Sequence, residues 1–187
     1  MQIRPAAEPD FADIQAIYAH HVLTGTGSFE TVPPSAEAMA RRLAAVQEEG
    51  LAWLVAADRS GVLGFAYYTR WHERAAYCYT VEDSIYVRDD VRGQGVGKAL
   101  VAALLDHAAS RGFRQMLAAI GDAENVSSIG VHASLGFTRV GVMKAVGWKH
   151  GRWLDVVLMQ RQLGRGDHAP PDRRHSLVPP DSDAGDE

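Results

Sequence analysis

The chain is poor in cysteine: its 187 residues contain one, Cys78. A single cysteine excludes an internal disulfide and a zinc site of the Cys-x-x-Cys kind, and a lone thiol is typical of a reducing compartment. Long apolar runs are also missing, since none approaches the roughly 20 residues that a membrane-spanning helix needs. The first residues lack the apolar core of a signal peptide. These shortages predict a cytoplasmic protein without a membrane partner.

The chain also has no excess of basic charge. It contains 19 Lys and Arg against 23 Asp and Glu, a net charge of -4. Nucleic-acid-binding domains usually carry a basic footprint, so we expect no nucleic-acid partner. Among the histidines, His20 and His21 are adjacent and would face apart on a helix, and His72 and His107 stand alone. None of them has the spacing of metal ligands, and we expect no metal site.

Composition divides the chain near residue 163. The whole chain is 47% hydrophobic and 22% charged, which is typical of a globular protein, and its length fits one domain. From Gly164 onward, Pro, Gly, Ser and charged residues replace the apolar ones. Such a segment cannot bury enough apolar surface to fold. We therefore expect one folded domain over residues 1–162 and a disordered C-terminal tail over residues 163–187.

Hydrophobic periodicity within the domain predicts alternating strands and helices. The order is strand, two helices, three strands, helix, strand, helix and two strands, which favours an α/β fold with a mixed sheet flanked by helices. The expected strands lie at residues 2–4, 51–57, 62–69, 77–87, 115–120, 137–143 and 153–161. The expected helices lie at residues 8–23, 36–49, 99–110 and 126–135.

The most informative stretch is at residues 92–98, which read Arg-Gly-Gln-Gly-Val-Gly-Lys. It follows a strand-like run and opens a helix-like run. The unpaired N–H groups at the start of a helix point outward, and the helix dipole favours an anion there. Glycines remove the Cβ atoms that would hold a pyrophosphate away. The stretch therefore predicts a phosphate-binding loop and a ligand that contains a nucleotide.

Two common nucleotide motifs do not fit this loop. A P-loop needs Gly, four residues and Gly-Lys-Ser/Thr, but Arg92 stands at the first position and Ala99 at the last. A dinucleotide fingerprint needs Gly-x-Gly-x-x-Gly and an acid about 20 residues on, but the run is Gly-x-Gly-x-Gly and no acid lies near Gln115. A glycine-rich turn without any ligand stays open, although the strand–loop–helix context disfavours it.

The spacing that fits is Arg-x-x-Gly-x-Gly, and other motifs accompany it. Together they resemble the GNAT superfamily of N-acetyltransferases, and are most similar to its phosphinothricin and methionine sulfoximine acetyltransferase subgroup. The resemblance covers residues 1–162. The glycine loop alone indicates only the superfamily, whereas the late Trp-Lys-His-Gly-Arg-Trp-x-Asp run is much more specific. The residues that carry the subgroup resemblance are 28–31, 80–87, Asn125, 132–137 and 147–155.

The resemblance implies a splayed central sheet, acetyl-CoA as co-substrate, no metal, and a homodimer. It implies direct acetyl transfer to the α-amine of a small amino-acid-like acceptor such as phosphinothricin, methionine sulfoximine or methionine sulfone, hence a role in antibiotic or herbicide resistance. Two alternatives stay open. One is acetylation of another amine (a polyamine, an aminoglycoside or a protein N-terminus), and the other is a non-catalytic acyl-CoA-binding sensor.

Two residues are the catalytic candidates. Glu82 lies in the strand before the glycine loop, and the resemblance assigns its counterpart the role of general base; without the resemblance it would be a solvated strand residue. Asp83 faces the other side of the strand and is the poorer base. His132 lies where many family members have a Tyr that protonates the leaving thiolate. It could donate that proton, hold the amine substrate, or be a hydrogen-bonded structural residue.

The binding residues are predicted from the same motifs. Backbone N–H groups at Ile85, Tyr86 and Val87, freed by a strand bulge, would bind the oxyanion. Asn125 would cap a helix and, with Ser128, contact the pantetheine arm. For the acceptor, Phe29 and Thr31 would wall the pocket and Arg74 would bind a carboxylate, assisted by Arg70, where the subgroup is variable. Tyr86, His150 and Trp153 would line the site. Glu30 departs from the Arg of some herbicide-resistance relatives, which leaves the preferred substrate open, and Trp148 and Trp153 fit core or dimer packing as well as they fit the site. The pyrophosphate ligands would be Arg92, Gly93, Gln94, Gly95, Val96, Gly97 and Lys98.

Overall fold

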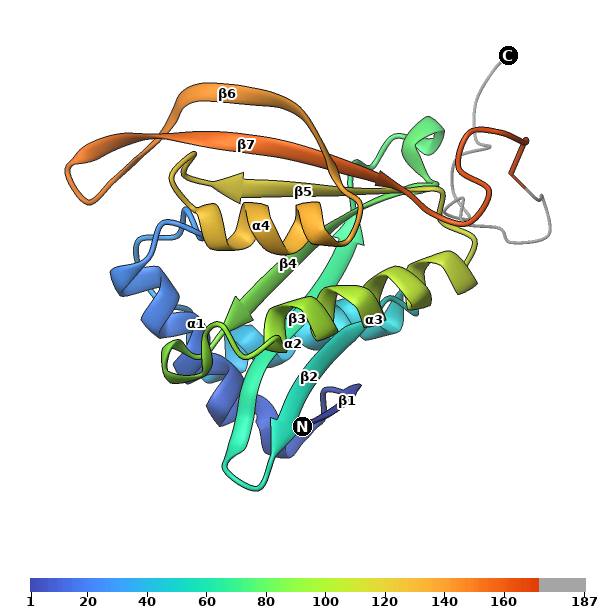
Figure 1. Ribbon diagram of the computed structural model, residues 1–187. Helices are drawn as coiled ribbons and strands as arrows, with labels where there is room; N and C mark the ends of the chain where they lie inside the picture. The colour runs from blue at the N-terminus through green and yellow to red at the C-terminus, as the bar shows by residue number, and fades with distance from the viewer. Residues whose placement is uncertain (172–187) are drawn as a thin grey trace, which may run out of the picture.

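Within residues 1–171, which the computed structural model describes, seven strands form one sheet in the order β1-β2-β3-β4-β5-β7-β6 (Figure 1). Neighbouring strands are antiparallel, except that β4 and β5 run parallel. Strand β7 lies between β5 and β6, so β6 is an edge strand. The strands are β1 (Gln2–Pro5), β2 (Trp53–Asp58), β3 (Gly61–Arg70), β4 (Thr80–Val87), β5 (Gln115–Gly121), β6 (Thr138–Lys149) and β7 (Arg152–Gln162).

Helices cover both faces of this sheet (Figure 1). Helices α1 and α2 pack on one face, mainly against β2, β3 and β4, and helices α3 and α4 lie on the other face. This arrangement confirms the predicted fold class. No helix of the described part is long and apolar enough to span a membrane. The helices are α1 (Phe11–Thr24), α2 (Ala36–Glu48), α3 (Val96–Ser110) and α4 (Val126–Ser134), with short 3-10 turns η1 (Glu8–Asp10), η2 (Ala75–Tyr77) and η3 (Asp89–Val91).

Local chemistry explains where the helices begin and which side they bury. The Ser35 side chain accepts a hydrogen bond from the N–H of Ala38 at 3.2 Å, and caps α2. Helix α3 buries an apolar stripe against the sheet, as its 3.6-residue period predicts. The stripe consists of Leu100, Val101, Leu104, Leu105 and Ala108.

The parallel strands β4 and β5 separate along their length. Their last paired residues are Asp83 and Ala118, although β4 continues to Val87 and β5 to Gly121. Beyond that pair, the facing edges of the two strands lose their ladder partner, and backbone groups there need another partner. The sheet therefore opens into a wedge, which confirms the splayed sheet expected from the resemblance.

The predicted strand bulge at residues 85–87 is wrong. The register between β3 and β4 runs without a shift from Gly64 opposite Val87 to Arg70 opposite Val81. The unpaired backbone groups of β4 come instead from its separation from β5. A bulge and a separation of strands both leave backbone N–H groups unpaired, but only the separation also makes room for a ligand between the strands.

Several element boundaries also differ from the prediction. Strand β6 extends to Lys149, whereas the sequence predicted an end near residue 143, and helix α3 begins at Val96 rather than Ala99. Strand β4 begins at Thr80 rather than at residue 77, and residues 8–10 of the first predicted helix form the 3-10 turn η1. Glycines at residues 141 and 147 interrupt the alternating pattern of β6, which also shifts its register against β7 near both positions. The glycine loop itself supplies the first turn of α3.

The start of the predicted tail packs on the domain. Leu163 is buried, and its N–H donates a hydrogen bond to the carbonyl oxygen of Arg114 at 2.9 Å. The Arg114 guanidinium donates in turn to the carbonyl oxygen of Gly166 at 3.2 Å. The rest of the predicted tail, residues 172–187, lies outside the described residues.

Candidate active site

The wedge between β4 and β5 opens into a cavity of about 720 Å³. Residues 83–87 of β4 form one wall and residues 118–122 form the opposite wall. The other walls are the glycine loop with the first turn of α3, the N-terminal part of α4, and residues 25–27 of the loop between α1 and α2. Cavities of several hundred Å³ are typical of sites for small molecules and cofactors.

The glycine loop leaves space where a phosphate would approach. Gly93 and Gly95 have φ angles of 76° and 83°, in the left-handed region that favours glycine. A Cβ atom built on either residue would meet no atom within 4 Å, so both backbones face open space. At Gly97, a Cβ would lie 3.2 Å from Cδ1 of Ile85, and glycine there lets α3 pack closely on β4. The loop and the N-terminus of α3 together fit an anion.

Two basic side chains line the cavity beside this loop. Arg92 is 57% exposed, and its guanidinium lies 2.5 Å from a carboxylate oxygen of Asp89, which also binds the His20 ring at 2.7 Å. Lys98 is exposed on the first turn of α3. A phosphate in the loop would therefore compete with Asp89 for Arg92. Gln94, the remaining predicted ligand of this loop, is not among the cavity residues.

The predicted contacts at the end of β4 divide between backbone and side chain. Ile85, Tyr86 and Val87 all line the cavity. The Tyr86 ring, however, packs in the core, edge-on to Tyr18 at 4.8 Å between centroids, and burial raises the pKa of its hydroxyl well above the ordinary value. Tyr86 therefore packs its ring in the core, and its N–H faces β3, because Arg88, two residues on, donates its N–H to Leu63 in the same antiparallel ladder. The N–H groups of Ile85 and Val87 face the wedge instead.

Helix α4 presents its first turn to the cavity. The Asn125 side chain accepts a hydrogen bond from the N–H of Ser128 at 3.2 Å and so caps the helix, as predicted. Both residues line the cavity. The polar groups of these two residues are therefore available to a ligand in the wedge.

His132 forms a buried ion pair with Asp83. Its Nε2 donates to Oδ2 of Asp83 at 3.0 Å and its Nδ1 donates to the carbonyl oxygen of Ser128 at 2.7 Å. The two side chains are 2% and 1% exposed. Because both partners are acceptors, both ring nitrogens carry protons and the ring is an imidazolium. Burial alone would lower the pKa of His132, but the hydrogen bond and charge of Asp83 outweigh it and raise the pKa.

Asp83 keeps one oxygen free of this pair. Oδ1 is buried and has no hydrogen-bond partner among residues 1–171, and Asp83 lines the cavity. Buried polar atoms are nearly always satisfied in folded proteins. This atom therefore fits a hydrogen-bond donor of a bound ligand or a water molecule.

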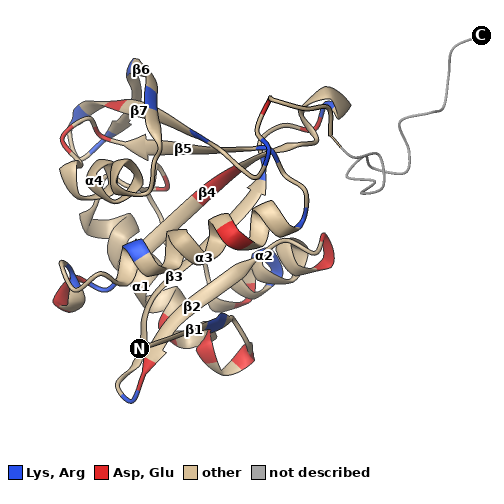
Figure 2. Cartoon of the chain, turned by 45° about the vertical axis from the view of Figure 1, so that its right-hand side comes forward, with Lys and Arg blue, Asp and Glu red and all other residues tan. Residues whose placement is uncertain are grey.

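Glu82 lies at the closed end of the wedge, one residue before the strands separate. Acidic residues of β4 lie within the sheet, where Figure 2 shows them in red. Glu82 is half-buried, and burial, followed by the charge of neighbouring Asp83, raises the pKa of its carboxyl. It is not among the residues that line the cavity, whereas Asp83 is. The two acids face opposite sides of the strand, as expected.

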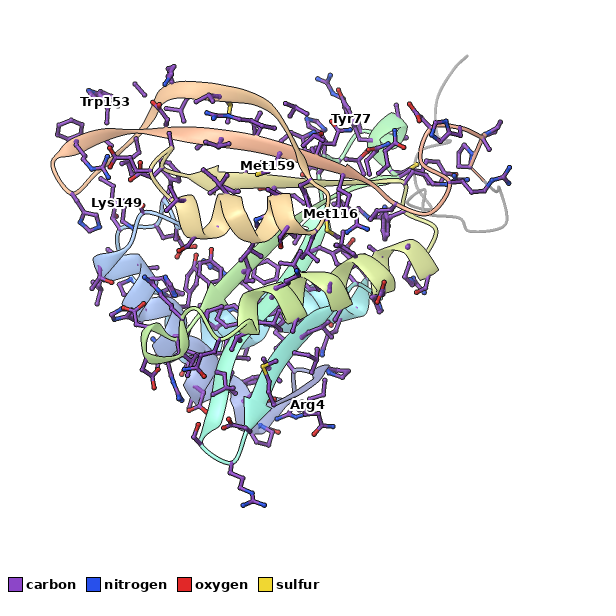
Figure 3. The ribbon with its side chains drawn as sticks, viewed as in Figure 1. Arg4, Tyr77, Met116, Lys149, Trp153 and Met159 are labelled. Carbon is purple, nitrogen blue, oxygen red and sulfur yellow. The ribbon has the colours of Figure 1, made fainter. Side chains whose placement is uncertain are left out.

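The structure does not bring the predicted acceptor residues together. Phe29 and Thr31 lie in the α1–α2 loop next to the cavity rim but are not among the residues that line it. Arg74 is exposed and directly precedes η2, which contains Tyr77. Figure 3 shows Tyr77 and the β6–β7 turn with Lys149 at opposite ends of the sheet. Arg74 does not line the cavity, so a contact between Arg74 and the acceptor within one chain stays a prediction.

Sequence reasoning missed several cavity residues. His21 donates from Nε2 to the carbonyl oxygen of Val87 at 2.8 Å, and burial lowers its pKa, so a neutral ring fixes the end of β4. The paired glycines at 25 and 27 were a signal for close approach of backbone to a ligand. The carboxyl end of β5 was another, because ligands often bind there in open α/β sheets. The missed lining residues include Gly25, Thr26, Gly27, Ser84, Val91, Ala118, Ala119, Ile120, Gly121, Asp122, Glu124, Val126, Ser127 and Val131.

The donor set of the site suits an anionic, nucleotide-containing ligand. Within residues 1–171, no group of three or more His, Cys, Asp or Glu side chains could hold a metal ion. Unpaired backbone groups, a helix N-terminus and two basic side chains converge on the cavity instead. A carboxylate with a raised pKa stands where the wedge closes. This arrangement can hold a phosphate-bearing arm and accept a proton at its far end.

Known proteins share this architecture. Residues 3–158 match the family model described as an acetyltransferase (GNAT) domain. The chain is 47% identical to a phosphinothricin N-acetyltransferase from Alcaligenes faecalis, over 91% of this chain and 86% of that protein. It is 40% identical to an L-methionine sulfoximine/L-methionine sulfone acetyltransferase from Pseudomonas aeruginosa, over 90% and 98%. A crystal structure of a phosphinothricin acetyltransferase from Sinorhizobium meliloti in complex with AcCoA superposes with a TM-score of 0.90 at 44% identity, covering 97% of this chain and 96% of that one. The chain belongs to the GNAT family of acetyltransferases.

Proposed function

We propose that the protein transfers an acetyl group from acetyl-CoA to the α-amine of a small amino-acid-like acceptor of the phosphinothricin, methionine sulfoximine or methionine sulfone type. The observation that carries this proposal is the wedge between β4 and β5, with the glycine loop on one wall and Glu82 at its closed end. The relatives named above are a phosphinothricin N-acetyltransferase and an L-methionine sulfoximine/L-methionine sulfone acetyltransferase. The free, buried thiol of Cys78 supports a reducing compartment, and we place the reaction in the cytoplasm.

In this proposal the residues divide three tasks. The backbone N–H groups of residues 93–98 bind the pyrophosphate, and the unpaired edge of β4 binds the arm and the oxyanion of the tetrahedral intermediate. Glu82 accepts a proton from the acceptor ammonium, directly or through one water, because only the neutral amine has the lone pair for attack. Acetyl-CoA supplies the thioester: the C–S bond breaks as the C–N bond forms, and the coenzyme A thiolate takes up the proton that the attacking nitrogen loses, so no covalent enzyme intermediate is needed.

His132 takes a positioning role in this scheme. Both of its ring protons are already donated, to Asp83 and to the Ser128 carbonyl. Giving one of them to a thiolate would break a buried ion pair, which is costly. We propose that His132 and Asp83 hold α4 against β4 and so fix the width of the wedge.

The proposal is tested most directly by thiol release from acetyl-CoA with a panel of amines. We expect release with phosphinothricin, methionine sulfoximine or methionine sulfone. Release only with polyamines, aminoglycosides or peptides would overturn the acceptor class. Tight acetyl-CoA binding without release for any amine would favour a non-catalytic sensor.

A first variant tests the glycine loop. Gly95→Val would force a side chain onto a residue with a φ of 83° and fill the open space above the loop. We expect the Kd for acetyl-CoA, measured by calorimetry, to rise by at least about 10-fold, or ~1.4 kcal/mol. Gly164→Val is the matched control, because Gly164 also has a positive φ and open space but lies outside the cavity. Equal affinity in both variants would refute the loop as the pyrophosphate site.

We also propose that two copies of the chain form a homodimer through β6 and β7. Large apolar side chains are exposed along these strands, including Trp148 at 58% and Trp153 at 61%, which contact each other edge-on at 5.3 Å between ring centroids. Exposed apolar surface of this kind is typical of an interface. The other exposed members are Val140, Met143 and Val146.

A charge on this surface should separate the copies. We expect sedimentation velocity to give the mass of two chains for the wild type and of one chain for Trp148→Asp with Trp153→Asp, because two buried charges cannot be tolerated at an apolar interface. Tyr77→Asp is the control, since Tyr77 is 44% exposed in η2, and Figure 3 shows it at the opposite end of the sheet from the β6–β7 turn. A wild type that sediments as a monomer at working concentration contradicts the proposal.

A further inference from the structure

Lys149, at the end of β6, is a buried lysine that the proposed mechanism does not use. It is 4% exposed, and its Nζ donates a hydrogen bond of 2.6 Å to the carbonyl oxygen of Ser28 in the α1–α2 loop. Figure 3 shows Lys149 on the underside of the β6–β7 hairpin, facing that loop. Burial lowers the pKa of Lys149, and the charge of Glu30 offsets this in part. A buried ammonium on a neutral acceptor costs free energy, so its presence calls for a reason.

The loop that Lys149 contacts is anchored from the other side as well. We call residues 25–31 the rim loop, because its first residues form part of the cavity wall. Ser28 is buried, and its hydroxyl bonds to the Tyr18 hydroxyl of α1 at 3.0 Å and accepts from the N–H of Glu30 at 3.2 Å. Glu30 pairs with Arg42 of α2 at 2.7 Å. Ser28 is thus held between α1 and the hairpin.

The hairpin is shaped to receive the rim loop. A Cβ atom at Gly147 would lie 1.7 Å from Cε1 of Phe29, so the ring occupies the space of the missing side chain. Strand β5 makes room for the loop in the same way, because a Cβ at its last residue, Gly121, would lie 2.3 Å from the carbonyl oxygen of Thr26. The His150 ring donates from Nε2 to the carbonyl oxygen of Gly25 at 3.2 Å. These contacts fix the loop at Gly25, Thr26 and Phe29.

The rim loop joins this anchor to the cavity. Residues 25–27 line the cavity, and Ser28, which Lys149 holds, is the next residue along the chain. A shift of Ser28 therefore moves the cavity wall directly. The glycine loop and α3, which offer the phosphate site, lie on a different wall, and the Nζ of Lys149 bonds to Ser28 rather than to them.

We propose that Lys149 is a positioning residue for the acceptor: it locks the rim loop against the β6–β7 hairpin and so sets the shape of the acceptor side of the cavity. This inference rests on the proposed acetyltransferase function, because it assigns the rim loop to the acceptor rather than to acetyl-CoA. It explains why a charged lysine is buried at a position where methionine, of similar length, could be buried at a lower desolvation cost.

The test is Lys149→Met, compared with Lys144→Met. Lys144 is also on β6, but it is 74% exposed and pairs with Asp155. We expect the KM for the acceptor to rise by about 10-fold or more in Lys149→Met, because the rim loop loses its bond to the hairpin and must be ordered when the acceptor binds, while the Kd for acetyl-CoA stays close to wild type. Gly147→Ala perturbs the same loop through Phe29 and should give the same KM signature.

A readout without turnover separates this inference from the proposed function. Hydrogen exchange of the amides of residues 25–31 should speed up in Lys149→Met, with no change in α3. If wild type releases no thiol with any amine, the proposed function fails, but faster exchange in the rim loop still supports the lock. Unchanged exchange in a folded Lys149→Met, or a KM change equal to that of Lys144→Met, overturns it. If Lys149→Met does not fold, an unchanged acceptor KM in Gly147→Ala overturns it.

Discussion

Replacement of Glu82 by Gln should lower kcat/KM for the acceptor by about 10²- to 10⁴-fold, the usual contribution of a general base, and leave the Kd for acetyl-CoA unchanged. The amide keeps the size of the carboxyl but cannot accept the ammonium proton. Glu82 lies beside the closed end of the wedge and is not a cavity-lining residue, so cofactor affinity has no reason to change. Single-turnover kinetics with saturating acetyl-CoA would measure the chemical step.

The pH profile makes this prediction sharper. A base is active when deprotonated, so the rate should rise with pH through the pKa of Glu82, which burial and Asp83 raise above the ordinary 4.5. In Glu82→Gln, the rise in rate with pH that reflects the deprotonation of Glu82 should disappear. Glu48→Gln, at an exposed position on α2, is the matched control and should keep both the rate and the profile. A Glu82→Gln enzyme with the wild-type rate and profile would show that another group accepts the proton.

The glycine loop was predictable because its signal is local. Seven consecutive residues carry both the spacing and the strand–loop–helix context, and neighbouring residues have little choice of conformation once Gly93 and Gly95 take positive φ angles. The caps at Ser35 and Asn125 and the stripe of α3 were predictable for the same reason, since each depends on residues within one or two turns.

The Asp83–His132 pair and the rim loop were not predictable from spacing, because they depend on which distant segments meet. Asp83 and His132 are 49 positions apart, and Ser28 and Lys149 are 121 apart. The alternation of side chains along β4 predicted that Asp83 faces away from Glu82, but it did not predict that Asp83 contacts a histidine of α4. In β6, the alternating pattern failed because an edge strand with exposed apolar residues has no uniformly buried face to reveal its length.

Breaking the Asp83–His132 pair should have the largest effect on stability. Asp83→Val leaves an imidazole without its acceptor in a site that is 2% exposed, and we expect a loss of about 3–5 kcal/mol of unfolding free energy. His132→Leu strands the carboxylate in the same way. The double variant removes both groups and should recover most of the stability, because well-packed apolar residues replace buried ion pairs at little cost.

The Kd for acetyl-CoA, measured in the double variant, then distinguishes a positioning role of the pair from a merely structural one. If the pair sets the width of the wedge, the double variant regains stability but keeps a raised Kd for acetyl-CoA. A double variant with normal stability and normal affinity would reduce the pair to a packing element. Single variants no less stable than wild type would contradict the buried ion pair itself.

The pair also predicts the direction of a pH effect. Folding raises the pKa of His132 above its ordinary 6.5, so the native state binds the proton more tightly than the unfolded chain does. The stabilisation from this proton is complete below about pH 6.5 and is lost as the pH rises through the folded-state pKa. Urea unfolding at a series of pH values should therefore show wild type losing its advantage over the double variant on the alkaline side. An advantage that grows with pH would mean that His132 is neutral in the folded protein and that the Asp83 contact is not an ion pair.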